Sequence, residues 1–158
     1  TLRFILEKNG FEVLEQEIVN RDTLAMIVRK RKKVDISNLI DSYSYIRKEI
    51  IAYIDSEIAI GHKVSIWGAS HQGFTLAATA DLGDKVTYII DSAPFKQGRY
   101  APTSHIPIIS PDKAVENPVD TVIIVAPGYT DEIADIIRNR FPQKTTIMVL
   151  KSNHLEQY

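Results

Sequence analysis

The positions of hydrophobic residues divide the 158-residue chain into a short front part and a longer part with a different pattern. Apolar residues in segment 2–8, followed by Asn9-Gly10, predict the end of a helix. Segments 11–18 and 23–29 predict two strands, and the polar residues between them suit the turn of an antiparallel hairpin. A helix and a hairpin of about 30 residues cannot bury a core alone. We therefore expect this part to complete a sheet that lies outside the chain, and the chain to be the C-terminal part of a longer protein.

A long amphipathic helix is predicted next, from Ser37 to about Ile60. Ser37 is a suitable N-cap and Gly61 can end the helix. We expect this helix to connect two units and to pack on both. The residues that recur on one face at helical spacing are Leu39, Tyr43, Ile46, Ile50, Tyr53 or Ile54, and Ile58.

Beyond Gly61 the pattern changes to alternating strands and helices. Near-continuous Val and Ile strands separated by helices are typical of a parallel sheet covered on both faces. We predict an α/β fold, a Rossmann-like parallel sheet with helices on both faces. The predicted division is 1–34 (the end of another domain), 35–61 (a connecting helix) and 62–158 (the Rossmann-like domain). The expected strands are 63–67, 86–90, 106–109, 121–125 and 145–150, and the expected helices are 73–80 and 131–140.

Composition and charge restrict the classes of function. The formal net charge of −1 argues against nucleic-acid and membrane-surface binding, both of which need a basic excess. The basic run 29–33 fits a solvated strand end and linker better than a phosphate patch. There is no cysteine, the four histidines lack metal-ligand spacing, and the longest apolar runs are too short to span a bilayer. A reducing cytoplasm is the simplest setting.

The first candidate for binding chemistry is segment 67–73, Trp-Gly-Ala-Ser-His-Gln-Gly, between the first predicted strand of the sheet and its helix. Glycines permit a tight turn, and free amides at the start of a helix can hold an anion. Ser70 stands where the dinucleotide fingerprint has its middle glycine, and no Lys-Ser/Thr pair follows Gly73 as in a Walker loop. Two interpretations stay open: a structural turn, or a site for a phosphate or polar sugar group with Ser70 and His71 at its mouth.

Asp91 ends the second predicted strand of the sheet. In nucleotide-binding Rossmann folds an acid at this position accepts hydrogen bonds from ribose hydroxyls. The sequence Asp-Ser-Ala-Pro is also good turn chemistry, so the carboxylate can instead cap the turn that follows. The two interpretations carry equal weight.

Two further segments supply polar side chains to the same edge. Lys96 and Arg99 are suited to neutralise a pyrophosphate, and Tyr100 to stack on a base or a sugar ring. His105 enters a strand, where a structural histidine is more common than a catalyst. Tyr129 follows the fourth predicted strand of the sheet and is expected to face the same crevice as Ser70. Thr130 is expected to cap the helix that follows, with acidic residues in its first turn.

Together these segments resemble one known family. The motifs are Trp-Gly-Ala-Ser-His-Gln-Gly, then Ile-Ile-Asp-Ser-Ala-Pro-Phe-Lys-Gln-Gly-Arg-Tyr ending at Tyr100, then His-Ile-Pro-Ile from His105, and Asp-Thr-Val-Ile-Ile-Val-Ala-Pro ending at Pro127. Over residues 35–150 they are similar to the C-terminal domain of S-adenosylmethionine-dependent C-methyltransferases that act on nucleotide-linked deoxysugars. Residues 1–31 resemble the last helix and hairpin of a class I methyltransferase domain.

The resemblance implies a cysteine-rich zinc-binding N-terminal region, a central S-adenosylmethionine domain and this C-terminal domain, with the nucleotide-sugar between the last two. It implies that the catalytic groups and the cofactor site belong to the central domain. We therefore expect this fragment to bind neither cofactor nor metal, to contain no catalytic residue, and to be inactive alone. The expected substrate-binding residues are Gly68, Ser70, His71, Gln72, Gly73, Asp91, Lys96, Arg99, Tyr100, His105 and Tyr129.

The sequence departs from the family pattern at the presumed crevice. Gln72 stands where the family usually has lysine, and Gly128-Tyr129 where it has tryptophan-asparagine. Residues 102–104 read Pro-Thr-Ser instead of Pro-Gly-Thr. Two other readings remain: a non-catalytic docking or nucleotide-binding module, and a nicotinamide-dependent oxidoreductase, which the missing middle glycine disfavours. The expected partners are a nucleotide-sugar, the upstream methyltransferase domain and a possible second copy of the chain.

Overall fold

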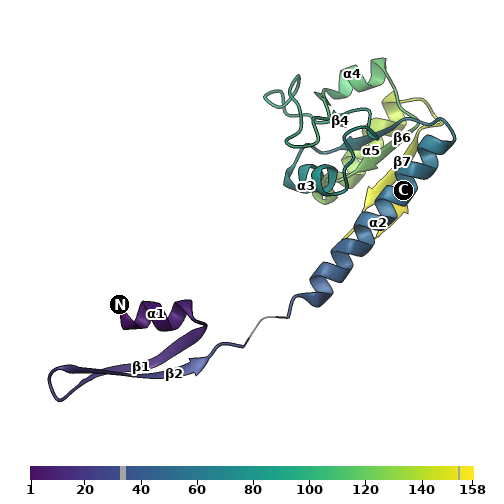
Figure 1. Cartoon of the computed structure of the whole chain (residues 1–158). Helices are drawn as coiled ribbons and strands as arrows, with labels where there is room; N and C mark the ends of the chain where they lie inside the picture. Colours follow the sequence, from purple (N-terminus) through teal and green to yellow (C-terminus); the bar gives the residue numbers. More distant parts are fainter. Residues whose placement is uncertain (33–34, 153) are drawn as a thin grey trace. The chain divides into compact units, whose positions relative to one another are not determined.

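The computed structural model describes residues 1–32, 35–152 and 154–158, and the chain forms two compact units, Thr1–Ser37 and Asn38–Tyr158 (Figure 1). Lys33 of the basic run and Val34 at the predicted boundary lie outside the described residues. No helix in the described ranges is long and apolar enough to cross a membrane.

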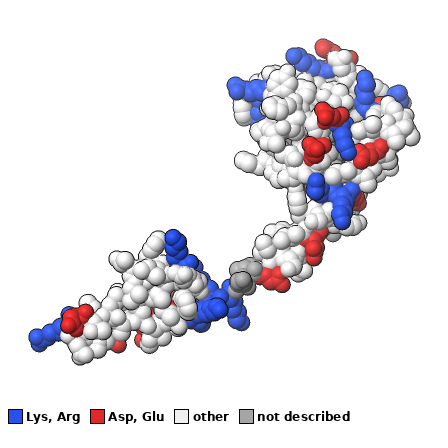
Figure 2. Space-filling model, in the orientation of Figure 1, with Lys and Arg blue, Asp and Glu red and all other residues white. Residues whose placement is uncertain are grey.

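The first unit is a helix followed by a hairpin, as the sequence predicts. Helix α1 (Leu2–Lys8) is followed by strands β1 (Phe11–Val19) and β2 (Thr23–Lys30), which pair antiparallel with a register shift between Val13 and Glu15. Lys and Arg side chains gather at one end of this unit (Figure 2). Arg29 pairs with Glu12 across the hairpin at 2.8 Å, and the described residues 29–32 of the basic run are all exposed.

None of the described residues of the first unit is buried. The side chain of Ile18 is 71% exposed and that of Ile27 is 57% exposed. Ile18 pairs with Leu24. Leu24 and Ile27 are three positions apart on β2, so Ile18 and Ile27 point to opposite faces of the hairpin. Strands that carry large aliphatic side chains on both faces are normally covered on both faces by other elements.

Helix α2 (Ser37–Ala59) packs on the second unit. Its first residue is Ser37, whose amide and hydroxyl both donate to the Asp35 carboxylate. The helix ends at Ala59, and the φ of +83° at the following Gly61 lets the His62 amide turn back to the Glu57 carbonyl. Ile50 and Ile54 are fully buried against the sheet, and Figure 1 shows the helix running along it.

The sheet of the second unit has the strand order β5-β4-β3-β6-β7-β8. All neighbouring pairs are parallel except β8, which runs antiparallel to β7. The chain moves outward from β3 through β4 to β5 and then returns to β6 beside β3, so the order reverses between β3 and β6. This reversal is the switch point at which doubly wound folds bind ligands. The strands are β3 (Val64–Trp67), β4 (Ile89–Ile90), β5 (Ile108–Ile109), β6 (Thr121–Ile124), β7 (Thr146–Leu150) and β8 (Leu155–Gln157).

Each face of the sheet has its own core. Ile66 belongs to the core under α2 and α3 (His71–Thr79), whereas Trp67 belongs to the core under α4 (Pro111–Glu116) and α5 (Thr130–Arg140). Ile54 fills the first core and Ile137 the second. The alternation along β3 therefore separates two helical layers. This confirms the predicted α/β fold with helices on both faces.

The details differ from the prediction at several places. Strand β5 is Ile108–Ile109 instead of 106–109, and helix α3 begins at His71 instead of residue 73. Strand β4 is only Ile89–Ile90 instead of 86–90, because the Val86 amide bonds to the Leu82 carbonyl in a turn. Helix α4 was not predicted, although Ser110 caps it and Pro111 opens it. Strand β8 was also not predicted; besides pairing with β7, it is held by the Leu155 amide, which donates to the Glu49 carboxylate of α2.

Candidate functional site

The carboxyl ends of β3, β4 and β6 enclose a cavity of about 450 Å³ at the switch point, which we call the strand-end cavity. This is the position at which a parallel α/β sheet binds its ligand. The cavity combines hydroxyls, two carboxylates and one ammonium group with an apolar wall from α5. Its lining residues are Trp67, Gly68, Ser70, Asp91, Ser92, Ala93, Lys96, Ala126, Tyr129, Glu132, Ile133 and Ile136.

The loop after β3 is a tight turn that leads into α3. Gly68 has φ +125°, a backbone conformation that residues with a side chain rarely adopt. Its amide donates to the Ile90 carbonyl of the neighbouring strand. Ser70 is the N-cap of α3, and its hydroxyl accepts the Gly73 amide at 3.3 Å. Segment 67–73 therefore forms a structural turn, which is one of the two interpretations of its sequence. Ser70 also lines the cavity, so its position remains compatible with a ligand.

Asp91 connects the two loops of this edge. One carboxylate oxygen, Oδ2, accepts the Ala69 amide at 2.8 Å, and the other, Oδ1, accepts the Ala93 amide at 2.9 Å. The Lys96 ammonium lies 3.0 Å from Oδ2. The carboxylate of Asp91 thus caps the turn that follows it, as one of the two interpretations of the sequence predicts. Because each carboxylate oxygen can accept two bonds, Oδ1 retains capacity for a ligand hydroxyl.

The loop after Asp91 forms a second cavity, of about 390 Å³, which we call the aromatic cavity. Lys96 lines both cavities. Arg99 is exposed and forms no side-chain hydrogen bond or ion pair with the part of the chain that the structure describes. The lining residues of the aromatic cavity are Phe74, Phe95, Lys96, Arg99, Tyr100, Pro102 and Ile108.

The structure brings some of the predicted binding residues together and separates others. Gly68, Ser70, Asp91, Lys96 and Tyr129 line the strand-end cavity, whereas Arg99 and Tyr100 line the aromatic cavity.

The other four predicted residues line neither of these two cavities. Gly73 is buried beneath the first loop, and His71 and Gln72 are exposed in the first turn of α3. His105 is exposed with φ +53°, in a turn where its amide bonds to the Ala101 carbonyl.

Helix α5 contributes lining residues that the sequence interpretation missed. Glu132 was read only as an acid that complements the helix dipole, yet it lines the strand-end cavity with Ile133 and Ile136. The signal available was its position at the start of a helix that follows a strand of the switch point. Thr130 does not cap this helix, which corrects the prediction. It is the first helical residue, and its hydroxyl donates to the Pro127 carbonyl, because the short helix η1 (Pro127–Tyr129) leads directly into α5.

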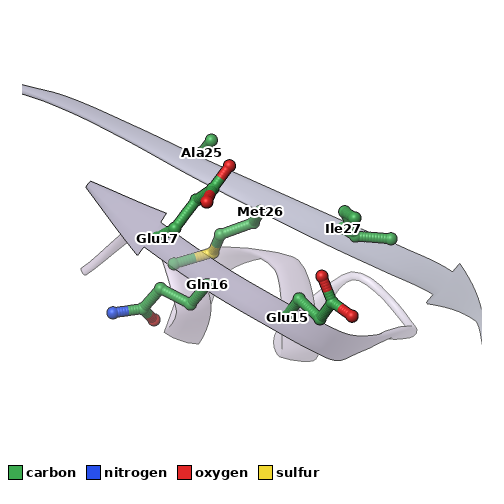
Figure 3. A pocket seen from close by; sticks show the side chains of 6 residues that line it. All are labelled: Glu15, Gln16, Glu17, Ala25, Met26 and Ile27. Atoms are coloured by element: carbon green, nitrogen blue, oxygen red, sulfur yellow. The ribbon is translucent and has the colours of Figure 1, made fainter. Parts of the chain in front are cut away.

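A separate hollow of about 390 Å³ lies on the hairpin of the first unit. Figure 3 shows Glu15 and Glu17 of β1 pointing to one side of the hairpin and Gln16 to the other. Two carboxylates without a cation are unsuited to a phosphate ligand. The hollow follows from the uncovered hairpin face, so we assign it no ligand.

Two groups with clearly shifted pKa values lie at the amino end of the sheet. Burial raises the pKa of Tyr88 to about 12, and its hydroxyl donates to the Asn117 carbonyl. The Lys63 amide, which donates to the Asp120 carboxylate at 3.0 Å, lowers the pKa of Asp120. These residues precede the strands and lie away from both cavities, so they contribute to stability and not to the candidate site.

Fold and site together define a Rossmann-like domain with a polar cavity at its switch point. The chain belongs to the family described as "C-methyltransferase C-terminal domain", which matches residues 29–150. That membership confirms the resemblance found in the sequence and supports a methyltransferase role.

Two individual proteins are similar to parts of this chain, and the share of each chain that is covered differs between them. The chain is 33% identical over 91 residues to "C-methyltransferase NovU" of Streptomyces niveus, a match that covers 57% of this chain and 22% of the relative. The chain thus spans less than a quarter of that curated relative. Among solved structures, the chain is similar to UDP-D-quinovosamine 4-dehydrogenase from Vibrio fischeri, with 17% identity and a TM-score of 0.44, over 61% of this chain and 93% of that one. So loose a similarity carries no argument about function.

Proposed function

We propose that this chain is the substrate-holding C-terminal part of an S-adenosylmethionine-dependent C-methyltransferase that acts on a nucleotide-linked sugar. The observation that carries the proposal is the strand-end cavity at the switch point, where hydroxyls and carboxylates lie with Lys96, together with the aromatic cavity that shares Lys96 and adds Arg99. Hydroxyls and carboxylates bind sugar hydroxyls, and cationic side chains bind a diphosphate. Membership of the C-methyltransferase C-terminal domain family supplies the reaction class.

The residues of the strand-end cavity do not fit S-adenosylmethionine. A cofactor on a Rossmann glycine loop needs free amides at the helix start and an acid free to accept ribose hydroxyls. Here the Gly73 amide is capped by Ser70, and Asp91 already accepts two amides and the Lys96 ammonium, which leaves a single acceptor position on Oδ1 where the two ribose hydroxyls would need two. We therefore place the cofactor, the general base and the enolate-stabilising donors in the part of the protein upstream of this chain. The fragment alone would then bind substrate without turnover.

The first unit supports the proposal that a methyltransferase domain precedes residue 35. Its hairpin exposes Ile18 and Ile27 on opposite faces and buries nothing, as expected of strands covered by another domain. We propose the division 1–34, 35–61 and 62–158 and a cytoplasmic setting. In a protein that includes the upstream domain, Ile27→Lys should lower stability, whereas in this chain it should change little. Equal small effects in both would contradict the covering domain.

Binding of a nucleotide-sugar to the chain tests the proposed function. Calorimetric titration with dTDP-glucose should show binding, and Arg99→Ala should weaken it about tenfold, because a charge-assisted bond to phosphate is lost. Arg47→Ala is the matched control, since Arg47 is exposed on α2 and makes no side-chain bond within the described ranges. Absence of binding in the unaltered chain, or an equal effect of both variants, would refute the assignment.

A second candidate function, docking without substrate binding, is favoured by one observation. The first turns of α2 expose Leu39 (69%), Ile40 (53%) and Tyr45 (61%), whereas Ile50 and Ile54 further along are buried. A helix end that stays apolar and uncovered is typical of an interface with another domain or subunit. Retained assembly with the upstream domain and no affinity for nucleotide-sugars would favour docking alone.

A further inference from the structure

The start of helix α2 carries an apolar stripe that the described residues leave exposed. Leu39, Ile40 and Tyr43 lie within about one turn of each other on this helix, and all three are exposed. We call them the α2 stripe. The same helical row continues into the domain, where Ile50 and Ile54 are fully buried in the core under α2. The stripe is therefore the uncovered continuation of a packed surface, which distinguishes it from a single exposed aliphatic side chain.

Tyr43 marks the place where the domain stops covering the helix. Its hydroxyl donates to the Thr79 hydroxyl of α3. Every residue from 35 to 43 is exposed, whereas Ile46, one turn further on, is partly buried against the core. Figure 1 shows the first turns of α2 extending past the sheet. These turns thus receive little support from the domain to which the rest of the helix belongs.

Local sequence does not account for this helical extension either. Segment 38–44 reads Asn-Leu-Ile-Asp-Ser-Tyr-Ser, and most of these residue types have weak helix propensity. Most of the stability of helices in proteins comes from packing an apolar face. An apolar stripe on a segment of weak helix propensity therefore favours a partner surface that packs on it.

The upstream domain is the body that the chain keeps within reach of the stripe. Residues 31–36 connect the end of β2 at Lys30 to the start of α2 at Ser37. Even fully extended, a connection of this length spans about 25 Å. In the proposed function the hairpin completes the upstream domain, so the tether keeps that domain near the stripe at an effective concentration on the order of millimolar. A second copy of the chain has no such tether.

The charge beside the stripe indicates the chemistry of the partner surface. Segment 35–46 contains Asp35 and Asp41 and no lysine or arginine. The hydroxyl and amide of Ser37 donate to Asp35 and lower its pKa, which keeps this carboxylate ionised. Asp41 is exposed and forms no side-chain hydrogen bond or ion pair within the described ranges. An apolar surface with a lysine or arginine at its rim complements such a stripe.

We propose that the α2 stripe is the docking surface for the upstream methyltransferase domain, which contacts it through an apolar patch that has a lysine or arginine opposite Asp41. The inference rests on the proposed function, and it adds the surface that joins the two domains and the chemistry of the partner. The stripe residues line neither the strand-end cavity nor the aromatic cavity. Docking and nucleotide-sugar binding are therefore measured separately.

Hydrogen–deuterium exchange tests the docking, both in this chain and in a protein that includes the upstream domain. Amides 41–45 should exchange about tenfold more slowly in the longer protein, because a covered helix opens less often. Leu39→Ser should abolish this slowing. Ile60→Ser is the matched control and should leave the slowing intact, because Ile60 is an exposed aliphatic residue outside the stripe. Equal exchange of these amides in the two unaltered proteins would overturn the proposal.

A charge variant tests the cationic rim, with each substitution made in both proteins. Asp41→Lys should remove most of the slowing in the longer protein, because like charges then meet across the interface. Asp84→Lys should have no effect, since Asp84 is exposed outside α2 and makes no side-chain bond within the described ranges. An intact slowing in Asp41→Lys would overturn the rim. A slowing that depends on protein concentration would assign the stripe to a second copy and overturn the upstream domain as its partner.

Titration with dTDP-glucose separates this proposal from the proposed function. Leu39→Ser in this chain should bind dTDP-glucose as the unaltered chain does, because Leu39 lines neither cavity. If dTDP-glucose binds but amides 41–45 exchange equally in the two proteins, the docking surface is wrong and the proposed function stands. If these amides are slowed but dTDP-glucose does not bind, the substrate-holding function is wrong and the docking surface stands.

Discussion

A Cβ atom added to Gly73 would lie 2.1 Å from the carbonyl oxygen of Gly68. The first turn of α3 therefore packs directly on the backbone of the loop that leads into it. This contact fixes the loop at the floor of the strand-end cavity, because Gly68 in turn donates its amide to Ile90 of the adjacent strand. The spacing of the two glycines is thus explained by close packing of a helix on a turn.

Gly73→Ala should destabilise the second unit by about 2 kcal/mol, because the new methyl group meets a backbone oxygen that cannot move without shifting the loop. Urea unfolding monitored by circular dichroism measures the change. Gly128→Ala is the control, because a Cβ atom at Gly128 meets nothing within 4 Å. A loss for Gly73→Ala as small as for Gly128→Ala would disprove the packing explanation.

Asp91→Ala should lower the free energy of unfolding by about 2 kcal/mol, since it removes the acceptor for the amides of Ala69 and Ala93 at a buried position. Asp55→Ala removes an exposed carboxylate paired with Lys85 and should change it by less than about 1 kcal/mol. Chemical denaturation of both variants makes the comparison. If Asp91→Ala proved as mild as Asp55→Ala, Asp91 would act on a ligand and not on the fold.

Asp120 should make stability depend on pH in the acidic range. Its pKa in the folded chain lies below the ordinary 3.8, mainly because the Lys63 amide donates to the carboxylate. A lowered folded pKa gives stability that is present above pH 3.8 and is lost as the pH falls through the folded value. Asp120→Ala should therefore be less stable than the unaltered chain at pH 7, with a difference that shrinks below pH 3.8. A difference that stays constant down to pH 2 would contradict this linkage.

Tyr88 should ionise at a higher pH than an ordinary tyrosine side chain. Burial raises its pKa to about 12 from the ordinary 10.0. The difference in absorbance at 295 nm between the unaltered chain and Tyr88→Phe should therefore stay flat through the range near 10 and rise near 12. Because the unfolded chain releases this proton first, the stability that Tyr88 provides below pH 10 is lost as the pH rises toward 12. A difference signal centred near 10 would show that Tyr88 is solvated.

The sequence indicated most of the fold because the elements carry local patterns. The runs of Val and Ile in β3, β6 and β7 and the amphipathic pattern of α5 placed those elements to within one residue. Weak or short signals were misread. The 86–88 segment has strand composition but its first residue lies in a turn closed by Leu82, and the three-residue β8 depends on pairing with β7 and on Glu49. Neither interaction is visible in local sequence.

By itself, the sequence determined the α/β class, the family and the segments that reach the carboxyl edge of the sheet, because strand ends and glycine turns are local features. Only the tertiary structure decided which side chains of those segments line the strand-end cavity and which line the aromatic cavity. It placed Arg99 and Tyr100 in one cavity, Ser70 and Tyr129 in another and Lys96 between them, and it added Glu132. Which side chains share a cavity depends on how α5 and the loop after β4 pack across the sheet, and that packing joins residues far apart in the chain.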